Sequence, residues 1–289
     1  MLKTVALTEK WNKNTECVLL LGGFDGLHAG HKKLLARAKT YGLPVGIMTI
    51  FGGKDGTELF TFSERQDLFL RAGADFVFGM HFADIKDMSA EVFLQMLRKE
   101  FRVKAFVCGD DFRFGYLAKG TPETLECGGQ VSVEVHEQVT IDGQKVSASC
   151  VKKLLGAGDI FGANRLLAEP FFFMGEVIKD RAVGRTLGFP TANVYYPEKK
   201  FPLKRGVYQT QVQLDGVTYK GITNYGTRPT FADDTLITET YLDGFSGDLY
   251  GKTLRVQFVR FLREVQKFDS VDELKKQLTE DIRRVREDD

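Results

Sequence analysis

The sequence predicts an α/β domain followed by a small antiparallel β-barrel domain that ends in a helix. In the first half, short apolar runs alternate with amphipathic helical patterns, which is typical of a mostly parallel sheet with helices on both faces. At about Glu169-Pro170 the pattern changes to strand after strand divided by turns, which favours a barrel. A chain of 289 residues is long enough for two cores, so we expect domains at residues 1–168 and 169–289.

The first half contains short apolar runs that predict strands and periodic segments that predict helices. A capping box, Ser63 with Gln66, is predicted to start the second helix, because each side chain can bond the other's backbone N–H. The predicted strands are residues 17–21, 44–50, 75–80, 104–108 and 131–139. The predicted helices lie near residues 31–40, 63–72, 89–100 and 121–127.

The second half shows a strand alternation, a hairpin signal and a closing helix. Along residues 208–214, apolar or threonine side chains alternate with glutamines, as on a strand with one buried face. Asp215-Gly216 then predicts a hairpin turn. Ser270 and Glu273 predict a second capping box, which starts the last helix. The apolar stripe of that helix is Leu274, Leu278, Ile282 and Val285.

The composition limits the partners and the compartment. Forty basic and 39 acidic residues give a formal charge of +1, which does not indicate nucleic acid or an anionic membrane. No apolar run reaches 18 residues, and the N-terminus lacks the apolar region of a signal peptide. We expect a reducing, cytoplasmic location, with the scattered cysteines as small core residues. These cysteines are Cys17, Cys108, Cys127 and Cys150.

Residues 184–193 form the first candidate site. Gly184 and Gly188 allow the backbone to approach a ligand closely, and the segment then becomes extended after its proline. In an extended segment Thr191 and Asn193 point to the same side. Hard oxygen ligands beside a glycine-rich turn suit Mg²⁺ that carries nucleotide phosphates. The same residue types are also ordinary in turns, so composition alone leaves the simpler interpretation open.

Residues 22–31 form the second candidate site, between the first predicted strand and its helix. His28 and His31 lie where a helix start attracts phosphate through free N–H groups, and histidines there can donate to phosphoryl oxygens. Gly26 and Gly30 leave room for a nucleotide against the backbone. A metal site is the competing functional interpretation, but no third ligand lies nearby in sequence. Surface histidines without a function are the simpler alternative.

The second half resembles riboflavin kinases. Residues 184–193 match the signature G-R-x-L-G-[FY]-P-T-A-N without a gap, and later segments resemble the family's remaining blocks. The resemblance implies that Thr191 and Asn193 hold Mg²⁺ and the ATP phosphates, that Glu239 is the general base, and that Arg263 covers the flavin. It also implies that the loop over the nucleotide is shaped by Gly184, Arg185, Gly188 and Pro190. The later matching blocks are residues 206–208, 221–231, 239, 247–252, 262–264 and 268.

Simpler roles remain open for two of these residues. Glu239 could be a solvated carboxylate on a strand, the commoner fate of a glutamate. It begins a match to the family's E-x-H, in which Tyr241 replaces the histidine. Arg263 could instead form a surface salt bridge with Glu264 or Asp269.

The first half resembles nucleotidyltransferases that carry HxGH on a Rossmann-like, dinucleotide-binding fold. Residues 22–31 are most similar to the FMN adenylyltransferase domain that precedes riboflavin kinase in bacterial bifunctional FAD synthetases. Residues 109–115 match that family's G-x-D-F-x-F-G block, so the resemblance covers essentially the whole chain. It implies that His28 and His31 are catalytic when the FMN phosphate attacks ATP. It also implies phosphate contacts from Gly22, Phe24, Asp25, Gly26, Gly30, Ser149 and Lys152.

A flavin contact is implied for Asp111, Phe112 and Phe114 in the matching block. Acids after a strand can instead cap the next turn, which is the alternative for Asp110 and Asp111. Aromatic residues at strand ends are more often core, which is the alternative for the two phenylalanines.

Two segments of the first half depart from the family pattern. T-F-x-P-H-P is replaced by residues 49–55, without the histidine or the prolines. I-S-S-T-x-I-R corresponds to residues 146–152, where Ser149 retains a hydroxyl and Lys152 keeps the charge but loses the planar fork of arginine. The loss of this fork, which can form two parallel hydrogen bonds to a phosphate, could weaken triphosphate binding by about 1–3 kcal/mol.

These departures leave three hypotheses. The first is a bifunctional riboflavin kinase and FMN adenylyltransferase, and the second is a riboflavin kinase whose first domain has lost or altered its activity. The third is a non-catalytic flavin-binding regulator. Under the first, Mg²⁺ accompanies ATP, whereas FMN and FAD are products. The expected partners are riboflavin, FMN and ATP, with no nucleic acid and no membrane, and weak self-association is left open.

Overall fold

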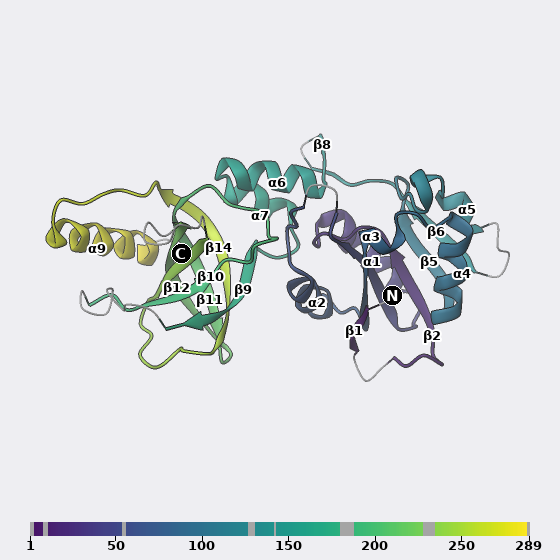
Figure 1. The fold of residues 1–289 in the computed structure, drawn as a ribbon, viewed down its shortest axis with the longest axis horizontal. Coiled ribbons are helices and arrows are strands. Elements are labelled where there is room, and N and C mark those ends of the chain that lie inside the picture. Colours follow the sequence, from purple (N-terminus) through teal and green to yellow (C-terminus); the bar gives the residue numbers. More distant parts are fainter. Residues whose placement is uncertain are drawn as a thin grey trace. The chain divides into compact units, whose positions relative to one another are not determined.

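The computed structural model describes residues 3–7, 11–53, 56–126, 131–141, 143–179, 188–227 and 235–287, and the chain divides into two compact units (Figure 1). The first unit contains Met1–Cys150 and Leu166–Ala168, and the second contains Val151–Arg165 and Glu169–Asp289. Residues 151–165 therefore group with the second unit, whereas the expected division at 168 assigned them to the first.

The first unit is an α/β domain, as the alternating pattern predicts. Its six-stranded sheet has the order β1-β4-β3-β2-β5-β6, in which β1 is antiparallel to β4 and all other pairs are parallel. The edge strand β1 was not predicted. The strands are β1 (Lys3–Leu7), β2 (Glu16–Leu21), β3 (Val45–Phe51), β4 (Phe76–His81), β5 (Arg102–Gly109) and β6 (Ser132–His136), with a small hairpin of β7 (Thr140–Ile141) and β8 (Gln144–Lys145).

The predicted helices of this unit all form. The N-cap of helix α2 lies two residues earlier than expected, so the capping box is Thr61 with Glu64, and the prediction of Ser63 with Gln66 is wrong. The helices are α1 (Ala29–Lys39), α2 (Phe62–Arg71), α3 (Phe82–Ile85), α4 (Ala90–Glu100) and α5 (Pro122–Glu126), with a 3₁₀ turn at Tyr116–Ala118. Among the described residues, no helix is long and apolar enough to cross a membrane.

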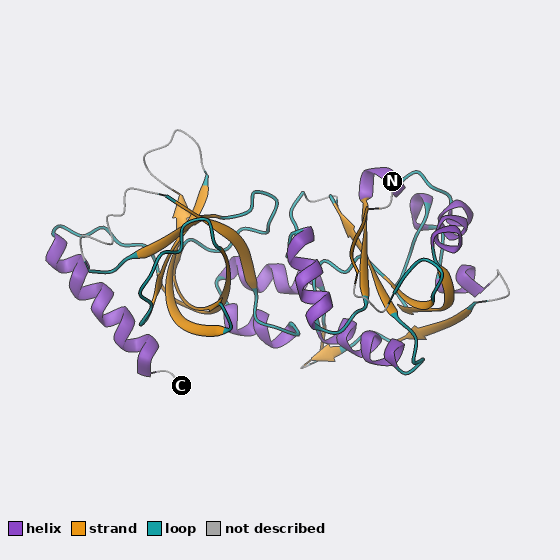
Figure 2. Ribbon diagram, turned by 90° about the horizontal axis from the view of Figure 1, so that it is seen from below, coloured by secondary structure: helices purple, strands orange, loops and turns teal. Residues whose placement is uncertain are grey.

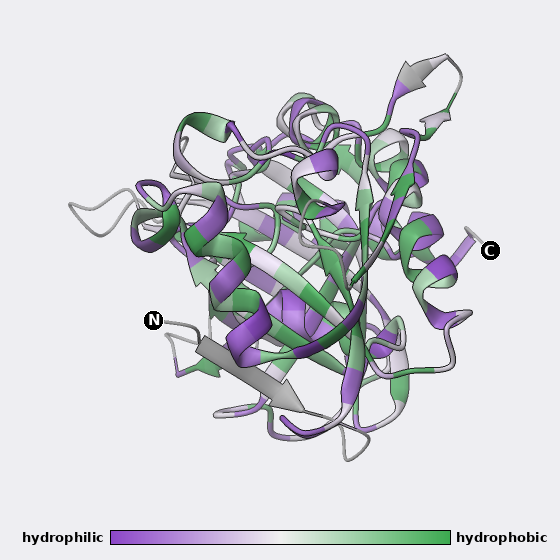
Figure 3. Ribbon diagram, turned by 90° about the vertical axis from the view of Figure 1, so that its right-hand side faces the viewer, coloured by the Kyte–Doolittle hydropathy of each residue, from purple (hydrophilic) through white to green (hydrophobic). Residues whose placement is uncertain are grey.

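The core of the first unit explains why its strands are continuous apolar runs. Strands β2 to β5 are buried on both faces because helices cover both sides of the sheet. The helices alternate hydrophilic and hydrophobic residues, as the purple and green bands of Figure 3 show. Trp11, the single tryptophan of the chain, is 5% exposed and stacks on Phe76 with ring centroids 4.1 Å apart.

The second unit contains a closed antiparallel barrel with strand order β10-β13-β12-β11-β14-β9, which confirms the predicted barrel (Figure 2). Its strands are β9 (Phe172–Ile178), β10 (Thr191–Tyr195), β11 (Gly206–Leu214), β12 (Val217–Thr227), β13 (Leu236–Leu242) and β14 (Thr253–Arg263). Within the described part of the chain, α6 (Ala148–Ala157) and α7 (Ile160–Leu166) precede the barrel and α9 (Val271–Glu287) follows it.

The hairpin and the closing helix form where the sequence predicts them. Asp215 and Gly216 have φ of 48° and 81°, the positive values that a two-residue type I′ turn requires. At the start of α9, Ser270 Oγ accepts from the backbone N–H of Glu273, whose own carboxylate accepts from Asp269 N. Of the two hydrogen bonds of the predicted capping box, only the one from Glu273 N–H to Ser270 Oγ therefore forms. The apolar stripe packs its buried end, Ile282 and Val285, against Val207 and Ile222 of the barrel.

Candidate active sites

The pairing of three barrel strands brings the predicted kinase residues into one row. Asn193 on β10 is the register partner of Glu239 on β13, and Glu239 is the partner of Asn224 on β12. Directly paired residues project to the same face of a sheet, so these three polar side chains are neighbours. Thr191, two residues before Asn193, projects to the same face at the exposed start of β10.

The amide oxygens on both sides of Glu239 have no hydrogen-bond partner among the described residues. The side-chain oxygens of Asn193 and Asn224 are buried, and within the described chain neither accepts a hydrogen bond. An unsatisfied buried carbonyl costs about 1–3 kcal/mol, so this row favours a site that binds a cation or a hydroxyl. Asn224 was not predicted as a site residue, although it lies within the matching segment 221–231.

The row also fits Mg²⁺ by its chemistry. Its donors are hard oxygens, and Mg²⁺ usually takes one or two carboxylates together with substrate phosphates. No group of three histidine, cysteine, aspartate or glutamate side chains among the described residues could hold a metal by itself. The remaining ligands of a bound Mg²⁺ would therefore come from the nucleotide and water.

Tyr241, which replaces the histidine of the family pattern, makes structural contacts beside the row. Its ring lies edge-on to Phe189, with centroids 6.0 Å apart, and its hydroxyl donates to Asp243 at 3.4 Å. Arg286 of α9 binds the same carboxylate at 2.7 and 2.8 Å and lowers the pKa of Asp243. Tyr241 thus links α9 to the turn before Thr191.

The loop before β10 is only partly described. Gly188 and Pro190 are exposed at its end, where Gly188 has φ of 86°. Gly184 and Arg185 lie outside the described residues.

Arg263 binds α9 and not the carboxylates considered from the sequence. Its Nε and Nη2 donate to the fully buried Asp281 carboxylate at 2.7–3.2 Å, so the alternative pairing with Glu264 or Asp269 is wrong. The pairing register separates Arg263 from Glu239 by three strand spacings, about 14 Å along the sheet. The flavin contact implied for Arg263 stays a prediction.

The second candidate site is a cavity of about 560 Å³ at the carboxyl edge of the first unit's sheet. Ser147 and Ala148 line it at the start of α6, whereas Ser149 is exposed one residue further on. Lys152 belongs to the second unit, where its ammonium lies 6.0 Å from the centre of the Phe201 ring. The predicted residues that line the cavity are Gly22, Phe24, Asp25, His28, Gly30, His31, Asp111 and Phe112.

The two histidines form a stacked pair with defined protons. Their ring centroids are 3.6 Å apart at 19°. His31 Nδ1 lies 2.8 Å from the carbonyl oxygen of Gly26, which can only accept, so this nitrogen carries a proton. His28 Nδ1 accepts from the His31 backbone N–H at 3.4 Å, so Nε2 carries the proton of neutral His28. That N–H can donate to a phosphoryl oxygen.

Burial keeps the histidine pair neutral. It lowers the pKa of His28 from 6.5 to about 4 and lowers the pKa of His31 well below its ordinary value, with the charge of His28 adding to the second effect. An imidazole that is neutral at pH 7 is a donor without a net charge.

Two glycines leave room for protein rings, and the nucleotide contact implied for them stays a prediction. A Cβ on Gly26 would lie 3.0 Å from the ring of Phe60, and one on Gly30 would lie 3.2 Å from the ring of His28. Contacts of that length are tighter than ordinary packing, so a side chain at either position would displace the ring. These glycines therefore permit the packing of the histidine loop.

Phe112 and Phe114 are both core residues and cavity walls. They are 8% and 6% exposed, with ring centroids 5.4 Å apart. Both line a second cavity of about 550 Å³, which shares Phe112, Ile50 and Arg113 with the first. Phe112 and Phe114 can therefore belong to the core and also contact a flavin.

Asp111 forms an ion pair at the first cavity. Its carboxylate lies 3.0 Å from Lys145 Nζ on β8, whereas the backbone N–H of Asp110 donates to His136. Lys145, Lys33 and Arg113 also line the cavity and bring positive charge to it, although none was predicted. The sequence offers one indication for Lys145, since it directly precedes the segment 146–152 that matches a phosphate-binding pattern.

The buried histidines predict that the first unit loses stability in mild acid. Between pH 6.5 and 4 the unfolded chain binds a proton at His28 that the folded chain does not, so stability falls as the pH falls. From pH 7 to pH 5, His28 alone should remove about 2 kcal/mol from the free energy of unfolding. Urea unfolding at each pH, followed by Trp11 fluorescence, measures the free energy of unfolding of this unit.

A cap-preserving variant provides the control. His28→Asn keeps a favoured N-cap residue for α1 but cannot titrate, so its stability should change less between pH 7 and 5. Parallel pH dependence of the two proteins would contradict the assignment.

Comparisons with known proteins match both units. The FAD synthetase family model matches residues 10–150, and the riboflavin kinase family model matches residues 167–288. A bifunctional riboflavin kinase/FMN adenylyltransferase of Pseudomonas fluorescens is 36% identical, over 92% of this chain and 91% of the relative. The protein of the same name from Escherichia coli K12 is 34% identical, over 94% of this chain and 92% of the relative. A Streptococcus pneumoniae crystal structure, described as a macrolide-efflux protein, has a TM-score of 0.84 at 27% identity and covers 96% of this chain and 95% of that one.

Proposed function

The chain belongs to the bifunctional riboflavin kinase/FMN adenylyltransferase family, and from that premise we propose how its two units divide the work. The enzyme uses ATP to phosphorylate riboflavin to FMN and to adenylylate FMN to FAD. We assign the first reaction to the barrel unit and the second to the α/β unit. The matches to both family models favour this enzyme over a riboflavin kinase with an inactive first domain and over a non-catalytic regulator.

The kinase proposal rests on Glu239 between two unsatisfied amide oxygens. Glu239 accepts the proton of the ribityl 5′-hydroxyl, whose oxygen bonds the γ-phosphorus of ATP while the bond to ADP breaks. Asn193 and Asn224 orient the carboxylate and the hydroxyl. Thr191 and Asn193 would hold Mg²⁺, which would neutralise charge on the ATP phosphates.

The adenylylation proposal rests on the stacked histidines in the first cavity. A phosphate oxygen of FMN bonds the α-phosphorus of a second ATP, and pyrophosphate leaves with the broken α–β bond. His28 donates from Nε2 to a phosphoryl oxygen as negative charge develops. Lys33 and Lys145 offset the charge of the phosphates, and the exposed Ser149 contributes a hydroxyl at the start of α6.

The flavin ring of FMN is assigned to the second cavity, against Phe112 and Phe114, because that cavity shares Ile50, Phe112 and Arg113 with the first as wall residues. We also place the enzyme in the cytoplasm, since Cys17, Cys108 and Cys150 are free thiols, which suit a reducing compartment. Neither nucleic acid nor a membrane is assigned as a partner.

A product profile tests the division of labour. The purified protein is incubated with riboflavin, ATP and Mg²⁺, and the flavins are separated by chromatography over time. FMN should appear first and FAD should follow, and addition of a chelator should stop both reactions. FMN without FAD would remove the second activity from the first unit, whereas no product would contradict both assignments.

A further inference from the structure

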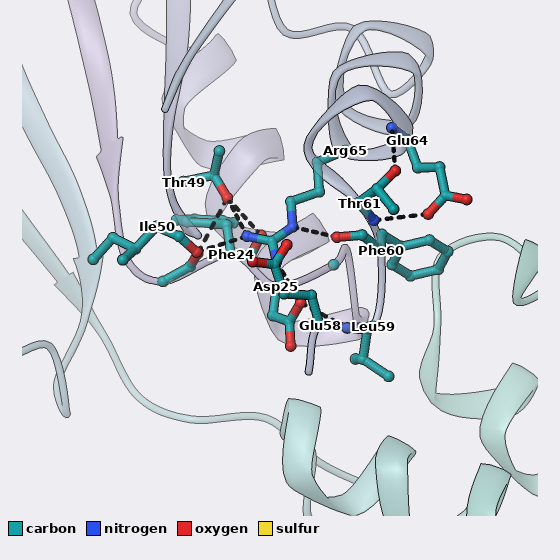
Figure 4. A network of polar contacts seen from close by, with 12 residues as sticks. Phe24, Asp25, Thr49, Ile50, Glu58, Leu59, Phe60, Thr61, Glu64 and Arg65 are labelled. Atoms are coloured by element: carbon teal, nitrogen blue, oxygen red, sulfur yellow. Dashed lines mark hydrogen bonds and ion pairs between the residues drawn. The ribbon is translucent and has the colours of Figure 1, made fainter. Parts of the chain in front are cut away.

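Arg65 on helix α2 is a buried arginine that joins three segments of the first unit. Its side chain is 1% exposed, and every one of its five N–H donors is used (Figure 4). Two of these bonds reach backbone carbonyls, at 2.8 Å to Phe60 and at 2.7 Å to Ile50. The guanidinium therefore fixes the end of β3 to the start of α2.

Two carboxylates complete the other side of the guanidinium. Arg65 Nη2 donates to Asp25 at 2.6 Å and to Glu58 at 2.9 Å. The same carboxylates accept backbone N–H groups, Asp25 from Leu59 at 2.8 Å and Glu58 from Gly52 at 2.7 Å. One arginine thus cross-links the loop after β2, which carries the catalytic histidines, to the segment between β3 and α2.

The fifth bond of Arg65 acts on a strained residue through Thr49. Arg65 Nη1 donates to Thr49 Oγ1 at 2.8 Å, so the single hydroxyl proton of Thr49 is left for the backbone oxygens of the loop after β2. The nearer of these is that of Phe24 at 3.0 Å, and that of Gly23 lies at 3.3 Å. Phe24 has φ of 41°, a left-handed conformation that costs a residue with a side chain about 1–2 kcal/mol. Such a conformation persists only when its surroundings fix it, and Thr49 is one of the groups that do so.

The ring of Phe24 carries this constraint to the histidines. It is 2% exposed and packs on His31, with ring centroids 4.2 Å apart. His31 in turn stacks on His28 at 3.6 Å. We propose that Arg65 is a positioning residue for adenylylation, which holds Phe24 through Thr49 and thereby sets the position of the histidine pair. The inference rests on the proposed role of that pair.

The test uses the full-length enzyme and measures FAD formation from supplied FMN and ATP. Arg65→Met should lower kcat by about 10- to 100-fold with the KM for FMN nearly unchanged, because a misplacement near 1 Å can cost about 100-fold. Arg65→Lys keeps the charge but has three donors in place of five, so it should recover part of the rate. FMN formation from riboflavin, which the other unit catalyses, should remain at the wild-type rate.

Two further variants separate positioning from stability. Thr49→Val removes the hydroxyl but keeps the shape, and it should lower kcat in the same way as Arg65→Met. Arg71→Met removes an exposed arginine from the same helix, where it pairs with Asp67, and should leave kcat unchanged. Trp11 fluorescence at the assay temperature verifies that each first unit is folded, because Trp11 lies in its core.

The proposal is overturned if folded Arg65→Met and Thr49→Val both form FAD with the wild-type kcat, since Arg65 would then only stabilise the unit. It is also overturned if both variants raise the KM for FMN without changing kcat. Failure of the histidine assignment is a separate result: FAD formation would then survive loss of His28 and His31 themselves.

Discussion

Glu239→Gln should reduce the rate of FMN formation by about 100- to 10,000-fold, the contribution of a well-placed general base. Glutamine keeps the shape of the side chain between Asn193 and Asn224, but it cannot accept the hydroxyl proton. The loss should therefore fall on kcat, with a small effect on the KM for riboflavin. Initial rates of FMN formation at several riboflavin concentrations, with saturating ATP and Mg²⁺, measure kcat and this KM.

Two controls make this result specific. Conversion of supplied FMN to FAD should proceed at the wild-type rate in Glu239→Gln, because that reaction is assigned to the other unit. Glu176→Gln removes an exposed glutamate from β9 of the same barrel and should leave both rates unchanged. A Glu239→Gln enzyme that makes FMN within about threefold of the wild-type rate would rule out Glu239 as the base.

Local chemistry explains which parts of the fold were predictable. The buried strands of the first unit are continuous apolar runs, and Asp215-Gly216 can adopt the two positive φ values of the hairpin. Each of these features depends on residues that are neighbours in the chain. The start of α2 shows the limit of such patterns, since Thr61 with Glu64 and Ser63 with Gln66 both fit a capping box, and the structure uses the first.

The candidate sites depend on contacts that a sequence pattern does not contain. Arg65 meets Asp25 across 40 residues of chain, and no local signal distinguishes it from Arg71 in the same helix. Asn224 becomes a neighbour of Glu239 only through the register of β12 and β13. The resemblance to known families supplied Glu239 and its surroundings, whereas the register shows which side chains lie beside it.

The segment between the two units was the least predictable. Residues 146–152 were interpreted through a phosphate-binding pattern, but they also begin helix α6, whose residues from Val151 onward group with the barrel unit. A short motif cannot indicate which core its helix joins, because that depends on the apolar residues further along. This explains why Ser147 and Ala148 line the first cavity while Lys152 belongs to the other unit.

His28→Ala combined with His31→Ala should suppress FAD formation from supplied FMN by at least about 100-fold, since the loss of a single preorganised donor to developing charge costs about 100- to 1,000-fold. FMN formation from riboflavin should persist, so the double variant should accumulate FMN. His81→Asn is the matched control, because His81 also lies at a strand end and caps a helix, and asparagine preserves a capping side chain.

The single variants resolve how the pair acts. His28 can donate from Nε2 in its neutral form, whereas the proton of neutral His31 is already given to Gly26. His28→Ala should therefore remove a direct donor, while His31→Ala should remove the stacking partner that holds it, and the double variant should lose less than the product of the two single effects. Additive losses would mean that the rings act independently. Equal loss of FMN and FAD formation in the double variant would contradict the assignment of one reaction to each unit, because the barrel contains neither histidine.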